Sequence, residues 1–112
     1  MNLTTTQSGE IQVITVNEAR IDASVAIQFK DAMRSISDEG TSRILLDLSQ
    51  VDFIDSSGLG AIVAAMKHIG SARKMDLSGL TPNVDKVFRL TRMDTIFGIH
   101  PSIEHAVAQS AG

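Results

Sequence analysis

The chain has 112 residues, a net charge of −3 and no cysteine, with 43% hydrophobic and 21% charged residues. This length and balance fit one folded domain, residues 1–112, and argue against disorder. The acidic balance and the absence of Trp and Tyr argue against nucleic-acid binding, which needs basic and aromatic surface. No apolar run approaches the roughly 20 residues that span a bilayer. We therefore expect no membrane segment and, because no disulfide can form, a cytoplasmic location.

The beginning of the chain predicts an antiparallel hairpin. Leu3–Ser8 and Ile11–Val16 are both rich in β-branched residues, and the second segment alternates apolar and polar side chains. Gly9 lies between them and predicts the turn. Residues 17–21 then lead the chain out of the sheet.

A helix is predicted from Ala23 to Ser37, because apolar residues recur there at helical spacing. Gly40 is expected to end it. The predicted buried face is formed by Val25, Phe29, Ala32, Met33 and Ile36. The predicted solvent face carries Gln28, Lys30, Asp31, Arg34 and Ser35.

The middle of the chain predicts a strand, a turn and a second helix. Arg43–Leu48 has apolar residues on both faces, which is typical of a central, covered strand. The turn Asp55-Ser56-Ser57-Gly58 follows, and Gly70-Ser71 closes the helix. Asp55 or Ser56 is well placed to cap this helix, since an oxygen there accepts from the amides of the first turn. Its predicted apolar face is Leu59, Ile62, Val63, Met66 and Ile69.

The last part of the chain predicts further alternating elements. Met75–Leu80 reads as a strand, and Thr81-Pro82 as the N-cap and first residue of a helix over Asn83–Arg92. Thr95–Ile99 predicts a short final strand or extended segment, and Pro101 opens a last helix. Strands separated by single helices imply parallel pairs with right-handed crossovers. We predict an α/β domain with a mixed β-sheet and about four helices.

The turn at Asp55 is the candidate functional site. It places the hydroxyls of Ser56 and Ser57 at the positive end of a helix, where an added phosphate is accommodated. The alternative is structural: Ser56 caps the helix, and the Ser57 hydroxyl serves its first turn. Gly58 and Gly60 are interpreted as close-packing or strain-relieving positions that keep the turn exposed and let backbone approach backbone.

Other chemistry finds little support in the sequence. His68, His100 and His105 lack metal-ligand spacing. Ser, His and Asp are all present, but the nucleophile elbow GxSxG is absent and the chain is short for a substrate pocket. The GLG segment lacks the lysine of a P-loop and the full GxGxxG spacing. We therefore predict no catalytic residue, no metal and no cofactor.

Residues 54–60, IDSSGLG, resemble the phosphorylation-site motif of STAS-domain anti-sigma-factor antagonists. The resemblance extends over nearly the whole chain. Asp22 before the first helix, LLDLSQVDFID before the turn, LSGLTPNVDKVFRLTRMDTIF after it and the closing PSIEHAV are similar to that family in order. The resemblance implies a single STAS-type domain.

The resemblance also implies a partner-switching function without catalytic machinery of its own. Ser56, with Ser57 as second choice, would be phosphorylated by an anti-sigma factor that is a serine kinase of the histidine-kinase-like ATPase type. A metal-dependent serine phosphatase of the PPM class would reset the cycle. Asp22 would contact the kinase, and it could also be the N-cap of the Ala23 helix, with Ser24 as competitor. The expected partner-binding residues are Asp22, Asp55, Ser56, Ser57, Gly58, Leu59 and Gly60.

Two alternatives remain open at this point. The same switch could control a non-sigma output, such as secretion or motility. A STAS domain could instead be an adaptor subunit of a transporter assembly. An intact Asp-Ser-Ser motif favours the switch over the adaptor.

Overall fold

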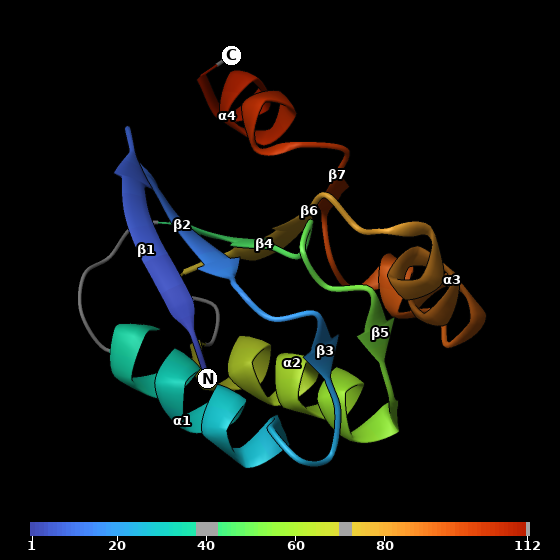
Figure 1. Ribbon diagram of the computed structural model, residues 1–112. Coiled ribbons are helices and arrows are strands. Elements are labelled where there is room, and N and C mark those ends of the chain that lie inside the picture. The colour runs from blue at the N-terminus through green and yellow to red at the C-terminus, as the bar shows by residue number, and fades with distance from the viewer. Residues whose placement is uncertain (38–42, 70–72, 112) are drawn as a thin grey trace.

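The computed structural model describes residues 1–37, 43–69 and 73–111. Seven strands and four α-helices alternate along these residues, with one short 3-10 helix, η2, before the last strand (Figure 1). The elements are β1 (Leu3–Ser8), β2 (Ile11–Val16), β3 (Arg20–Ile21), α1 (Ala26–Ser37), β4 (Arg43–Asp47), β5 (Phe53–Ile54), α2 (Ser56–Ile69), β6 (Met75–Ser78), α3 (Pro82–Leu90), η2 (Met93–Thr95), β7 (Ile99–His100) and α4 (Ile103–Ala111).

The main sheet is mixed, as predicted. Its five strands have the order β1-β2-β4-β6-β7. β1 and β2 form the expected antiparallel hairpin, and Gly9 supplies the positive φ of +60° in its turn. The pairs β2–β4, β4–β6 and β6–β7 are all parallel, so the predicted parallel pairing is confirmed.

Helices cover both faces of this sheet (Figure 1). α1 and α2 lie side by side on one face, and α4 lies on the other. The main core contains Phe29 and Met33 of α1, Ala61, Ile62 and Ala65 of α2, and the strand residues that face them. The predicted apolar faces of both helices pack on this core, which confirms their phase. A smaller cluster under α4 contains Ile11, Val13, Leu45 and Ala106.

α1 begins at Ala26 and not at Ala23. The four residues before it form a turn, in which the backbone N–H of Val25 donates to the carbonyl of Asp22 at 3.0 Å. The Asp22 side chain accepts from the backbone N–H of Ser24 within this turn. Asp22 is therefore not the N-cap of α1, because α1 begins four residues after it; its carboxylate caps the preceding turn instead. The predicted terminators Gly40 and Gly70-Ser71 lie outside the described residues.

Element boundaries also differ in the second half of the chain. β6 ends at Ser78, because Gly79 turns the backbone with a φ of +68°. Thr81 occupies the N-cap position of α3, but its hydroxyl donates to the carbonyl of Val51 at 2.7 Å and makes no cap. The predicted strand over Thr95–Ile99 is wrong in its first part. A 3-10 turn over residues 93–95 precedes β7, which begins only at Ile99.

A second, two-stranded sheet positions the candidate site. β3 pairs in parallel with β5, Arg20 opposite Phe53 and Ile21 opposite Ile54. The chain after β3 turns into α1, and the chain after β5 enters α2, so the two turns lie next to each other (Figure 1). None of the helices in the described ranges is long and apolar enough to cross a membrane.

Candidate functional site

Asp55 is the residue that holds the site together. Its Oδ1 accepts from the backbone N–H of Gly58 at 2.8 Å, which is the capping bond of α2. Its Oδ2 accepts from the backbone N–H of Ala23 at 3.1 Å. Asp55 is therefore the N-cap that the sequence left open between Asp55 and Ser56. One carboxylate fixes the start of α2 and ties it to the turn that precedes α1.

Ser56 and Ser57 are the first two residues of α2, and both are exposed. Since Asp55 caps the helix, Ser56 is not needed for that task. Its position at the positive end of the helix suits a phosphoryl group, because the first-turn amides and the macrodipole favour negative charge there. An exposed hydroxyl in this place is accessible to a modifying enzyme.

The two glycines of the motif play different parts. Gly58 is buried, and a Cβ on it would lie 1.9 Å from the carbonyl oxygen of Ile21, so its close packing against backbone is as predicted. Gly60 is exposed, with no atom within 4 Å of a Cβ built there, and the same prediction for Gly60 is wrong. Leu59 is half-buried and packs against the core. Of the predicted partner-binding residues in α2, the exposed ones are therefore Ser56, Ser57 and Gly60.

Asp22 lies in the turn beside Asp55 and carries an ionised carboxylate. The Ser24 hydroxyl donates to its Oδ1, and Arg20 Nε donates to its Oδ2 at 3.2 Å. The hydrogen bond from Ser24 and then that from Arg20 lower the pKa of Asp22 below its ordinary value of 3.8. Because a lowered pKa favours the charged form, the Asp22 carboxylate stays ionised to a lower pH than an ordinary aspartate. The surface around Ser56 thus presents two acidic side chains before any modification.

Arg20 and Phe53 belong to this surface and were not predicted. The Arg20 guanidinium carbon lies 4.2 Å from the centre of the Phe53 ring, a cation–π contact across the β3–β5 pair. Phe53 is 40% exposed, which is high for a large apolar side chain. Strands of two residues are too short to show an alternating pattern, so no sequence signal identifies this pair.

Replacing Asp55 with alanine is expected to lower the free energy of unfolding by about 2 kcal/mol, the upper end for loss of an N-cap. The reason is that the substitution removes the cap and the bond to Ala23 together. Urea denaturation measures the change. The control is Asp52→Ala, since Asp52 is exposed and its carboxylate accepts only one long hydrogen bond among those described, from the Asn83 side-chain amide at 3.4 Å. Equal losses in the two variants would contradict the assigned role of Asp55.

The histidines do not form a metal site within the described ranges, where no group of three or more His, Cys, Asp or Glu side chains is placed to hold an ion. His100 Nε2 lies 3.0 Å from Asp76 Oδ2, and Ser78 is opposite His100 on the neighbouring strand. These three residue types suggest a hydrolytic triad. However, Ser78 is fully buried, so its hydroxyl cannot meet a substrate.

Comparison with known proteins identifies the family. A family model described as the STAS domain matches residues 2–106 of the chain. BtrV of Bordetella bronchiseptica, which carries the name of an anti-sigma factor antagonist, is 30% identical over 97 residues, covering 86% of this chain and 77% of BtrV.

Solved structures share the fold. The anti-sigma factor antagonist SpoIIAA in its unphosphorylated form has a TM-score of 0.69 at 20% identity, with 99% of both chains covered. The phosphorylated form of SpoIIAA, a Bacillus cell fate determinant, has the same TM-score and identity, covering 97% of this chain and 99% of SpoIIAA. The murine anion transporter Slc26a9 matches with a TM-score of 0.81 at 16% identity, covering 95% of this chain and 18% of the transporter. At these identities the structural matches establish the fold alone.

Proposed function

We propose that this chain, which belongs to the STAS domain family of anti-sigma factor antagonists, is a binding protein regulated by phosphorylation of Ser56. The observation that carries the proposal is the exposed Ser56 at the first position of α2, next to the Asp55 cap. Asp22, Asp55 and the exposed residues Ser56, Ser57 and Gly60 form the partner-binding surface. Gly58 and Leu59 contribute indirectly: Gly58 packs against the backbone of Ile21, and Leu59 packs against the core.

The regulation follows from charge. A phosphoryl group adds about −1.5 to −2 charges and three acceptor oxygens. The α2 N-terminus partly compensates this charge, so the domain stays folded when it is modified. A partner docked on the turn would have to bury the added charge beside the carboxylates of Asp22 and Asp55. Arg20 is already paired with Asp22 on this surface, so burying the added charge is unfavourable and phosphorylation releases the partner.

The partner that suits this cycle is an anti-sigma factor of the histidine-kinase-like ATPase type. It binds the unphosphorylated protein, gives up its sigma factor, and then uses ATP to phosphorylate Ser56 and end the complex. A metal-dependent serine phosphatase of the PPM class restores the binding form. The existence of SpoIIAA structures in both phosphorylation states supports such a cycle in a protein of this fold. We place the cycle in the cytoplasm, where ATP and sigma factors are found.

Two alternative functions differ from this proposal, one in the process that is regulated and the other in the partner. A kinase partner that controls secretion or motility would keep the same switch with another client. A transporter adaptor would use the fold without the switch. The fold match to a domain of Slc26a9 is compatible with an adaptor. The adaptor function, however, does not account for an exposed Ser56 beside Asp55.

The test is incubation of the purified protein with ATP and a candidate anti-sigma kinase from the same genome, followed by intact-mass and peptide mass spectrometry. We expect a single added phosphate on Ser56, absent from Ser56→Ala and present in Ser57→Ala. A phosphate on Ser57 alone would mean that the regulatory phosphorylation site is Ser57 and not Ser56. No phosphate with a kinase active on another substrate would favour the adaptor.

A further inference from the structure

A pocket lies between α1 and α2, well away from the Asp55 turn. We call it the inter-helix pocket. It has a volume of about 240 Å³ and is lined by Lys30, Asp31 and Arg34 of α1 and by Ala64, Ala65 and His68 of α2. Ala64 is eight residues beyond Ser56 along α2, or about 12 Å along the helix axis. The pocket is therefore separate from the proposed phosphorylation site.

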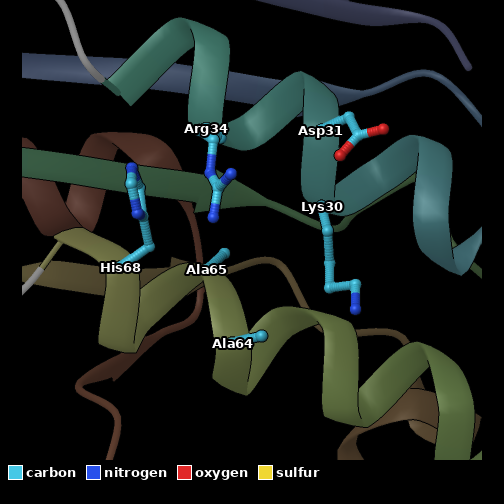
Figure 2. A pocket seen from close by; sticks show the side chains of 6 residues that line it. All are labelled: Lys30, Asp31, Arg34, Ala64, Ala65 and His68. Carbon is cyan, nitrogen blue, oxygen red and sulfur yellow. The ribbon is translucent and has the colours of Figure 1, made fainter.

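The side chains of Lys30, Arg34 and His68 lie in a row along the space between the helices (Figure 2). Lys30 and Arg34 extend from α1 toward α2, and His68 extends from α2 toward α1. The Asp31 carboxylate stays beside α1 and does not reach toward α2. Ala64 and Ala65 contribute only methyl groups, which leaves room between the two helices. The lining of this small space thus holds two cations and an imidazole against one carboxylate.

Helix dipoles explain only part of this charge. Arg34 lies in the last turn of α1 and His68 in the last turn of α2, where cations are favourable. Lys30 is only the fifth residue of α1, too far from its C-terminus for that effect. Arg34 and His68 each also take part in a further interaction within the protein. A guanidinium has five N–H donors, however, so Arg34 can keep such a contact and still bind an oxyanion.

We infer that the inter-helix pocket binds a small free phosphate dianion. Arginine offers a planar fork of donors that matches phosphate oxygens, and lysine adds a point charge. The volume is below the roughly 300 Å³ at which pockets for drug-sized ligands begin, so it suits a phosphate group better than a whole nucleotide. Lys30, Arg34 and His68 are exposed, so the pocket is open to solutes. The same exposure makes the binding weak and sensitive to salt.

The test is an NMR titration of the ¹⁵N-labelled protein with sodium phosphate at fixed pH, compared with sodium chloride at equal ionic strength. We expect saturable shifts of the amides of Ala64, Ala65 and His68 with phosphate only. In the double variant Lys30→Gln, Arg34→Gln, phosphate affinity should fall at least about tenfold, as expected for loss of charged hydrogen bonds. Lys86→Gln is the control, because Lys86 is an exposed lysine on α3.

Two results would overturn the inference. One is a set of shifts that chloride reproduces at the same ionic strength. The other is equal phosphate affinity in the wild type and the double variant. The amide spectrum itself reports whether the double variant is folded, and Lys30→Gln alone replaces it if it is not. Neither result depends on Ser56, since the titration uses the unphosphorylated protein without a partner.

Discussion

Replacing Gly58 with alanine is expected to lower the free energy of unfolding by about 3 kcal/mol, the upper range for overpacking a well-filled site. The added Cβ would lie 1.9 Å from the carbonyl oxygen of Ile21 and 3.0 Å from Cγ1 of Ile54. The first of these atoms is backbone, so it cannot move away without shifting β3. Alanine is favoured over glycine in a helix by only about 1 kcal/mol, which does not offset the clash.

Gly60→Ala is the matched control, two residues further along the same helix. A Cβ at Gly60 would meet no atom within 4 Å, so only the helix preference remains. This variant should be more stable than the wild type by about 0.5–1 kcal/mol. Urea denaturation of the three proteins provides the comparison. If both variants unfold at the same urea concentration, α2 does not start against β3 as described.

Replacing Ser56 with aspartate is expected to weaken binding to the anti-sigma kinase by roughly tenfold to a hundredfold, or about 1.4–2.8 kcal/mol. The aspartate adds one negative charge where a phosphoryl group adds about −1.5 to −2. The new charge lies on a surface that already carries Asp22 and Asp55, and Arg20 there is already paired with Asp22, so a docked partner would bury an added negative charge. Isothermal titration with the purified kinase measures the affinity.

Ser56→Asn separates charge from size, because asparagine has the shape of aspartate without its charge. It should bind within a few fold of the wild type, and Ser56→Ala should bind constitutively. If Ser56→Asp and Ser56→Asn lose affinity equally, the regulation is steric and the proposed role of charge is wrong. Ser57→Asp provides a second comparison, since Ser57 is exposed on the same turn.

The sequence predicts the elements whose pattern repeats over several turns or residues. The apolar face of α2, with Ile62 buried and Met66 packed on the core, follows from spacing alone. The hairpin at Gly9 follows from two β-branched segments with a glycine between them. In both cases the relevant contacts are local or periodic, so the chain itself contains the signal.

The sequence does not predict features made by a few residues from distant parts of the chain. β3 and β5 have two residues each, and they are strands only because they pair with each other. α1 begins only at Ala26, after a turn in which the Asp22 carboxylate accepts from Ser24 and the Asp55 carboxylate accepts from the N–H of Ala23. No propensity scale includes that second, long-range contact.

The two candidate sites show the same division. The Asp55-Ser56-Ser57-Gly58 turn is contiguous, so its motif is visible in the sequence. The inter-helix pocket is not contiguous, and Lys30 and Arg34 were predicted to lie on a solvated helix face. They do lie on an exposed face. What the pattern cannot supply is that His68 of α2 extends toward the same space (Figure 2).

The most direct test of the central claim is the dissociation constant of one anti-sigma kinase for two forms of this protein, unphosphorylated and phosphorylated only on Ser56. The proposed function predicts tight binding of the first form and a loss of at least about a hundredfold for the second, more than a single aspartate causes. Circular dichroism should show that both forms are equally folded. Equal affinity of the two folded forms would contradict the claim that a phosphate at the α2 N-terminus controls partner binding.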